Sequence, residues 1–434
     1  MHIEHRIIFG HVRFHVNLSA SLPHLPAMEF AAQRMTRERF ILRVAELLHA
    51  HGTPTHRGEA LVVRLGETLR VPLQVSFSPT DLLLSFGEEP DVRTVVRRVL
   101  PGTAQLGRLA TTTEVLDDVF AGRLGLNRAR RRLEMIARQR AAFGPGMVVL
   151  AVALTAASAA PLLGGGPREI AVAGLLGGLV AVLEYVLRSS PRTALLAEPT
   201  CALFVGFASH ALARSWFPHA DGVVALATLI VIVPGLTFTT ALVELATGHW
   251  AAGTARVAGA LGMFLQIAVG VALGRTLAGS WVALVPQAPV EVDPLGPMAT
   301  VFATGVAALT FAMLFQARPK DWPWIVLACM FTSLGQTLGV EALGPRLGAF
   351  GGALVLGLLS NAYASGGRRP ALVLLTPGIL LLVPGSVGYR SLDLFMAHDV
   401  LAGLETGVEM LIIATSIVAG LLVAGSILPP RRDL

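Results

Sequence analysis

Ten apolar stretches fill the chain from residue 145 to residue 426, and they limit its possible folds more than any other feature. Each is close to the roughly 20 residues that a helix needs to cross the core of a bilayer. The chain is 53% hydrophobic with a mean hydropathy of +0.65, which is too apolar for a soluble protein of this length. The sequence therefore predicts a polytopic α-helical membrane protein with ten transmembrane helices. The stretches are 145–163, 168–187, 196–216, 222–246, 252–273, 298–317, 323–340, 346–364, 370–389 and 401–426.

The chain before these stretches carries most of the Arg, Asp, Glu and His residues. Residues 36–140 predict a small cytoplasmic α+β domain, preceded by a flexible extension, 1–35. Thr36 is expected to cap the first helix, strands are expected near 69–77, 81–86 and 94–100, and two short helices are expected between 105 and 121. The closing basic helix, 126–140, is typical of a segment that binds anionic lipid beside a membrane.

The apolar stretches divide into two sets of five. Residues 141–273 form the first predicted repeat and 298–426 the second, with an extracytoplasmic linker at 274–297 and a cytoplasmic tail at 427–434. Because each set has an odd number of crossings, two similar sets in tandem must have opposite orientations. The sequence therefore predicts a 5+5 inverted repeat, an arrangement that permits alternating access around a site near the bilayer midplane.

Loop charges set the expected orientation. With the N-terminal domain inside, nine Arg and Lys residues fall on the inner side and five on the outer side, so both termini are expected in the cytoplasm and the protein in the cell (inner or plasma) membrane. The net charge of +6 then needs no nucleic-acid partner. The inner residues are Arg188, Arg192, Arg256, Arg318, Lys320, Arg368, Arg369, Arg431 and Arg432; the outer residues are Arg168, Arg214, Arg275, Arg346 and Arg390.

Two of the apolar stretches contain matching Val-Pro-Gly sequences. Pro234-Gly235 interrupts the fourth stretch, and Pro384-Gly385 interrupts the ninth, 150 residues later. A further break is expected at Thr376, Pro377 and Gly378. Broken helices at corresponding positions of two halves indicate a transporter's binding site. Pro and Gly are also common in membrane helices that bind nothing, and this alternative stays open.

Polar groups near the breaks are the candidate substrate ligands. Freed peptide groups and half-helix ends can bind a carboxylate or an ammonium group, and hydroxyls can both donate and accept hydrogen bonds. Arg390 could hold a substrate carboxylate or anchor an outer loop. This chemistry suits a small zwitterion or a carboxylate. The hydroxyl candidates are Thr237, Thr239, Thr240 and Ser386.

Glu244 and Glu409 are the candidate proton-coupling groups, because ionisable side chains inside a membrane are costly and usually functional. Glu244 could carry a proton or pair with an ammonium group. It could equally be an interfacial residue near the cytoplasmic end, paired with Arg256. Glu409 has the same two interpretations.

Motifs for other chemistry are missing from the sequence. Two cysteines, Cys201 and Cys329, cannot form a disulfide framework or a metal site by count. No spacing fits a nucleophile or a metal site, and no G-x-x-x-x-G-K-[ST] motif for ATP occurs. We therefore expect no enzyme activity, no cofactor and no metal, and transport driven by a gradient.

Three stretches together resemble the threonine/serine exporter family in its fused form. They are the FILRVAELLHAHGTPTHRGEALVVRLG segment with RARRRLEMIA, the VPGLTFTTALVELATGHWAAGTARVAGA segment, and LTPGILLLVPGSVGYRSL. The resemblance covers about residues 36–426. It implies a cytoplasmic N-terminal domain, ten membrane helices and proton-driven export of threonine and serine. Where the family motif is expected to have Asp after the first break, this chain has Glu244.

Two other functions remain open. Split relatives of that family include dicarboxylate exporters, so a succinate-type substrate is an alternative. The protein could instead be a membrane signalling module or enzyme that acts through residues 36–140. The expected partners are a small-molecule substrate, protons and the lipid bilayer, and the sequence leaves open whether the chain forms a homo-oligomer.

Overall fold

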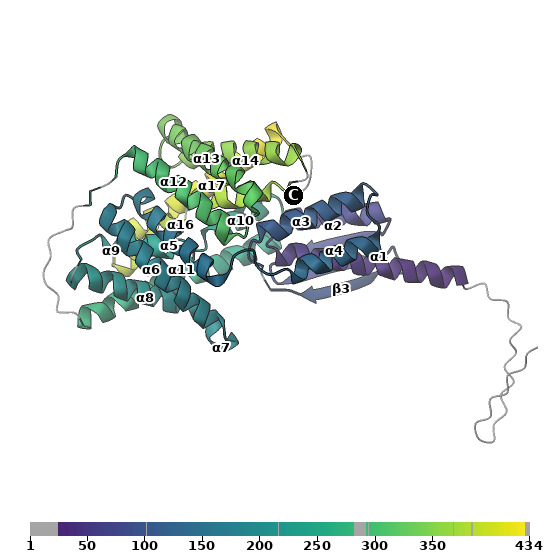
Figure 1. Cartoon of the computed structure of the whole chain (residues 1–434), viewed down its shortest axis with the longest axis horizontal. Helices are drawn as coiled ribbons and strands as arrows, with labels where there is room; N and C mark the ends of the chain where they lie inside the picture. The colour runs from purple at the N-terminus through teal and green to yellow at the C-terminus, as the bar shows by residue number, and fades with distance from the viewer. Residues whose placement is uncertain are drawn as a thin grey trace, which may run out of the picture.

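The computed structural model describes residues 25–100, 102–215, 217–281, 292–293, 295–367, 369–382 and 385–429. It has two regions, which lie side by side (Figure 1). The N-terminal region combines a small sheet with helices, and the larger region from residue 145 onward is helical in all its described segments. The predicted extension and tail fall largely outside the described residues, as do residues 282–291 and 294 of the predicted linker, whose first part, 274–281, belongs to a helix.

The described residues of the N-terminal region form three strands and four helices. The strands pair antiparallel in the order β1-β2-β3, with Leu84 of β2 opposite Val75 of β1. Alternate residues of β2, Leu82, Leu84 and Phe86, are buried because successive strand residues point to opposite faces. The elements are α1 (Leu25–Ala50), α2 (Thr55–Leu69), β1 (Leu73–Phe77), β2 (Asp81–Phe86), β3 (Arg93–Arg98), α3 (Leu106–Phe120) and α4 (Leu126–Arg138).

Two sequence predictions for this region are wrong. Helix α1 begins at Leu25, so Thr36 lies inside a helix and does not cap it. The two short helices expected between 105 and 121 are one continuous helix, α3. The hydroxyls of Thr111 and Thr113 each donate to the carbonyl four residues earlier at 2.9 Å, so these threonines are accommodated within the helix.

The larger region is built from helices packed around the two interrupted segments. Within the described residues, seven of its helical spans are long and apolar enough to cross a membrane. Helices α8 and α14, and the short pair α9 and α10, are not among the seven. The elements are α5 (Pro145–Leu162), α6 (Pro167–Arg188), α7 (Pro191–Ala194), α8 (Ala197–Ser215), α9 (Asp221–Leu229), α10 (Gly235–Ala246), α11 (Trp250–Trp281), α12 (Pro297–Leu314), η1 (Pro319–Asp321), α13 (Trp322–Leu343), α14 (Gly348–Ser365), α15 (Leu372–Leu382), α16 (Gly385–Met396) and α17 (Val400–Ile427).

The first predicted break is present, and of the second predicted break only Thr376-Pro377-Gly378 and Gly385 lie within the described residues. Helix α9 ends at Leu229 and α10 begins at Gly235, directly after Pro234. Helix α15 continues through Pro377, so the break expected at Thr376-Pro377-Gly378 is wrong. Most of the span Leu372–Met396 is buried, and packing on all sides maintains the helix despite the hydrogen bond that a proline removes. Helix α16 begins at Gly385, and Pro384 lies outside the described residues.

The same pattern of neighbours occurs twice in the helical region. Helix α11 packs on α8 and α10, and α17 packs on α14 and α16. Helix α9 packs on α5, α6 and α8, and α15 packs on α12, α13 and α14. Across the two sets, α16 contacts α11, and α10 contacts α17. Each interrupted segment therefore packs against both sets of helices.

Glycine permits the closest of these contacts. A Cβ atom at Gly274 of α11 would lie 2.2 Å from the carbonyl oxygen of Leu203 on α8. A Cβ atom at Gly420 of α17 would lie 2.6 Å from the carbonyl oxygen of Phe350 on α14. Real Cβ atoms do not approach a backbone oxygen so closely. Both helix pairs therefore need glycine, which has no Cβ atom, at these positions.

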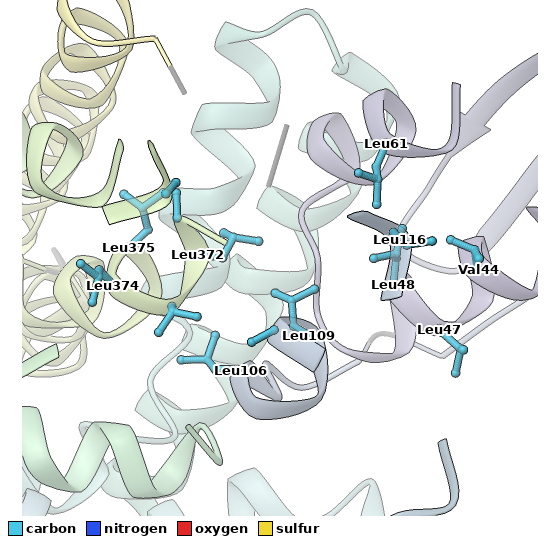
Figure 2. Packing of buried hydrophobic residues seen from close by; sticks show 14 of the residues in the cluster. Val44, Leu47, Leu48, Leu61, Leu106, Leu109, Leu116, Leu372, Leu374 and Leu375 are labelled. Atoms are coloured by element: carbon cyan, nitrogen blue, oxygen red, sulfur yellow. The ribbon is translucent and has the colours of Figure 1, made fainter. Parts of the chain in front are cut away.

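The N-terminal region packs on one end of the helical region, which we call the domain end; the opposite end is the far end. At the domain end, the Leu106 and Gly107 amides donate to the carbonyls of Phe315 and Gln316 after α12, at 2.9 and 3.1 Å. Leu106 and Leu109 also lie beside Leu372 at the start of α15 (Figure 2). One apolar cluster therefore continues from the N-terminal region into the interrupted segment α15–α16.

Candidate functional site

The residues around the first break divide into buried and exposed side chains. Thr239 on α10 is fully buried, and its hydroxyl has no hydrogen-bond partner within the described part of the chain. Pro234 and Gly235 are buried, Thr240 is half-buried, and Thr237 is exposed. Among the predicted threonines, Thr239 is thus the one whose polar atom is enclosed and free to bind a ligand.

Around the second break, the predicted residues lie in different environments. Thr376, Pro377 and Gly378 are buried within α15, and Gly385 is buried at the start of α16. Ser386 is half-buried. Arg390 is exposed, so it does not point into the protein interior.

Two further buried hydroxyls flank the breaks and were not among the sequence candidates. Thr228 lies one residue before the end of α9, and Tyr389 lies four residues after the start of α16. Both hydroxyls lack a hydrogen-bond partner among the described residues. Tyr389 belongs to the same apolar cluster as Val233 and Phe238 beside the first break. A buried, unsatisfied hydroxyl costs free energy, so such groups are natural ligands for a polar guest.

Glu244 lies at the domain end, away from solvent. Its side chain is 0% exposed and forms an ion pair with Arg256, with Nε of the arginine 2.9 Å from Oε2. The backbone amide of Thr55, at the start of α2, donates to Oε1 at 3.0 Å. The N-terminus of a helix favours a negative charge, so Glu244 attaches α10 to the N-terminal region. This geometry corresponds to the interfacial alternative considered for Glu244; a role in proton coupling stays a prediction.

A second contact beside Glu244 involves two histidines. Nε2 of His249 lies 3.2 Å from Oε2 of Glu59, and the His56 and His249 rings are 6.0 Å apart. Burial, together with the positive charges of Arg57, His249 and Arg256, lowers the pKa of His56 to about 3. His56 is therefore neutral at physiological pH.

Glu409 lies apart from both breaks. It lines an open groove of about 540 Å³ at the far end, between the α13–α14 turn and α17. Arg346, which lines the same groove, pairs with Glu405 at 3.6 Å. The structure therefore does not bring together the two carboxylates predicted to carry protons.

A charged network at the far end joins the two helix sets. Nη1 of Arg275, on α11, lies 2.6 Å from Oδ1 of Asp393 on α16. Nε of Arg275 is 3.8 Å from Oδ2 of Asp221 at the start of α9. The same Oδ2 atom is 2.9 Å from Nδ1 of His210 on α8. In the sequence analysis, Arg275 was counted among the loop charges. Only its position at the end of an apolar stretch could have suggested that it pairs with carboxylates of other helices.

The described residues contain no group of three or more His, Cys, Asp or Glu side chains that could hold a metal ion. Cys201 and Cys329 are buried and unpaired, on α8 and α13.

Interrupted apolar helices, several of them long enough to cross a bilayer, define a multi-pass membrane protein. The chain belongs to the ThrE family: the model described as "Putative threonine/serine exporter" matches residues 39–278. A second model, described as "Threonine/Serine exporter, ThrE", matches residues 300–427. The family is described as a transporter family, not as an enzyme family. No solved structure matches the chain.

Several fungal proteins are similar to most of the chain. An uncharacterized protein of Schizosaccharomyces pombe is 25% identical, over 89% of this chain and 50% of its own length. Proteins named pheromone-regulated membrane protein 10 are 25% identical in Yarrowia lipolytica, over 82% of this chain and 30% of theirs, and 25% identical in Saccharomyces cerevisiae, over 86% and 49%. The chain thus spans half or less of the length of these relatives.

Proposed function

We propose that the chain is a proton-coupled secondary exporter of threonine and serine that works by alternating access between two halves. The observation that carries the proposal is the pair of interrupted helices at corresponding positions, each packed against both helix sets. Transporters bind their substrates at such discontinuous helices, where peptide groups are free of partners. The family description supports the substrate class.

The architecture that we propose has ten membrane segments in a 5+5 inverted repeat. Helices α8 and α14 and the pair α9–α10 would complete the crossings beyond the seven apolar spans. The repeated neighbour pattern supports two equivalent halves. Opposite orientation is supported by the end of α10 and the start of α15, which both meet the N-terminal region. The start of α9 and the end of α16 both contribute to the far-end network.

In this arrangement the domain end faces the cytoplasm, in the cell membrane. The domain end carries Arg256, Arg318 and Lys320, in agreement with the excess of positive charge on cytoplasmic loops. Arg318 pairs with Glu114 of α3 at 2.7 Å, so these charges also hold the N-terminal region in place. The predicted contact between the basic helix α4 and anionic lipid would occur on this side.

The chemistry of the breaks suits a small hydroxy amino acid. The start of each half-helix, at Gly235 and Gly385, favours a carboxylate through the partial positive charge of a helix N-terminus. The buried hydroxyls of Thr239 and Tyr389 can exchange hydrogen bonds with a substrate hydroxyl.

Counterflow of labelled threonine and serine in proteoliposomes tests this function, with succinate as competitor. Wild type should show saturable counterflow that unlabelled threonine inhibits and succinate does not. Thr239→Val, which keeps the side-chain shape, should raise the half-saturation concentration about tenfold, the equivalent of one buried hydrogen bond. The control is Thr337→Val, because the exposed Thr337 hydroxyl bonds only its own helix, at Ser333. Absence of threonine and serine flux would overturn the proposal, and succinate flux in its place would make the protein a dicarboxylate exporter.

A further inference from the structure

At the far end, Arg275 contacts both interrupted segments. It lies near the end of α11, with Asp393 of α16 on one side and Asp221 of α9 on the other. Asp221 is the first residue of α9, and Asp393 is in the last turn of α16. Any motion that separates the two halves at this end must therefore break the contact between Arg275 and Asp393.

The side chains of this network are partly exposed. The side chain of His210 is 18% exposed, and those of Asp221 and Asp393 are 35% and 34% exposed. Glu244, by contrast, is fully enclosed. A group that exchanges protons with the solution needs such access.

The titratable and charged groups that face Asp221 come from four neighbouring elements. His210 of α8, Arg275 of α11, and Asp393 and Tyr389 of α16 interact with it directly or through Arg275. Glu169 of α6 accepts from the amide of the adjacent residue Ala220, at 2.9 Å, and His219 lies 3.4 Å from Ser209. Helix α5, which also packs on α9, has no titratable side chain.

We propose that His210 and Asp221 form the proton-binding site of the exporter, and that Arg275 transmits their protonation state to the second half. The proposal rests on the proposed function. One proton from the far-side solution binds to the pair and removes its net negative charge; no other bond forms or breaks. Asp221 then attracts Arg275 less, and Arg275 stays with Asp393, which keeps the far end closed. When the proton leaves, Asp221 competes for Arg275, and the far end opens more easily.

The distances agree with a closed far end. Arg275 is 2.6 Å from Asp393 but 3.8 Å from Asp221. In this cycle the open far end releases substrate and takes up a proton, and the proton favours closure. The proton is then released on the cytoplasmic side once the domain end has opened, so that a proton moves inward as an amino acid moves outward, and Arg275 is a positioning residue in that exchange.

Proteoliposome transport by Asp221→Asn tests the proposal. The variant should keep threonine counterflow at equal pH on both sides. It should lose accumulation driven by a pH gradient by about tenfold, within the range of typical coupling free energies. Its counterflow should also depend less on pH than that of wild type. The matched control is Glu405→Gln, a far-end carboxylate that pairs with Arg346 within the second half; it should behave as wild type.

The opposite results are distinct. Undiminished gradient-driven accumulation in Asp221→Asn would overturn the proposal. So would loss of both counterflow and accumulation with an unchanged melting temperature, because Asp221 would then serve binding itself. If Asp221→Asn does not fold, His210→Gln replaces it with the same expected result and the same refuting results.

A failure of the proposed function would give a different pattern. Wild type would then move neither threonine nor serine. Proton binding by His210 and Asp221 can still be tested in detergent-solubilised protein. The measurement is the pH dependence of the melting temperature without substrate. A difference between wild type and Asp221→Asn near neutral pH supports the proton site alone, and equal profiles for the two proteins overturn it.

Discussion

Arg256 and Arg275 lie on the same helix, α11, 19 residues apart, or about 28 Å along the helix axis. Arg256, at the domain end, pairs with a fully buried carboxylate that also accepts from the Thr55 amide. Arg275, at the far end, is shared between Asp393 and Asp221, and all three side chains are partly exposed.

The difference separates a fixed ion pair from an exchangeable one. A buried carboxylate with an arginine and a backbone amide as partners has no favourable alternative, because removing either partner leaves an unpaired charge in a dry environment. An arginine between two half-exposed carboxylates can change partner at little cost. We therefore assign attachment of the N-terminal region to the domain end and proton coupling to the far end.

The largest expected effect is at the domain end. Glu244→Ala leaves Arg256 without its buried partner and should lower the free energy of unfolding by about 3–5 kcal/mol. The melting temperature in detergent and the rate of proteolysis of the N-terminal region measure this. Glu184→Ala is the control, since its pair with Arg188 is more exposed and should contribute about 1 kcal/mol or less. Unchanged stability of Glu244→Ala together with loss of gradient-driven export would reverse the assignment of the two ends.

A smaller effect is expected where α11 meets α8. Gly274→Ala places a Cβ atom against the backbone near Leu203, beside Arg275, and should cost about 1–3 kcal/mol of stability. Gly262→Ala on the same helix is the control, because nothing lies within 4 Å of its Cβ position. Its higher helix propensity should leave stability equal or raise it by up to about 1 kcal/mol. Melting temperatures measure both variants, and equal values would mean that the α8–α11 contact is not tightly packed.

Acid should weaken the domain end through His56. Its pKa is about 3 in the folded protein and about 6.5 in the unfolded chain, so the unfolded chain binds the proton first. The contribution of neutral His56 to the free energy of unfolding is fully present above about pH 6.5. It falls by about 1.4 kcal/mol per pH unit as the pH decreases toward 3. His56→Gln should make the melting temperature depend less on pH in this range. The control His398→Gln, at an exposed residue, should leave the pH dependence of the melting temperature unchanged. Equal slopes for wild type and His56→Gln would place the acid-sensitive group elsewhere.

The smallest effect is expected for Arg390. Its side chain is exposed, so Arg390→Ala should change apparent threonine affinity by less than about 0.5 kcal/mol. Half-saturation in counterflow measures this. A tenfold loss would instead support the original prediction that Arg390 holds the substrate carboxylate, and would give the far end a binding role as well.

The local predictions that agree with the structure depend on short-range chemistry. The strand Asp81–Phe86 follows from its alternating apolar residues, and the break before Gly235 follows from the missing amide of Pro234. The prediction at Pro377 fails for the complementary reason. Its local signal is the same, but α15 is buried on all sides and tertiary packing maintains the helix.

The sequence by itself determined that this is a membrane protein, that its N-terminal region is polar with a small sheet, and where its first helix breaks, because hydropathy and proline act within a few residues. Tertiary structure alone decided which charges are partners. Thr55 and Glu244 are 189 residues apart, and Arg275 and Asp393 are 118 residues apart. No periodicity reports such distances, because a charge inside an apolar helix looks the same in sequence whether it is fixed in a buried pair or shared at an exposed end.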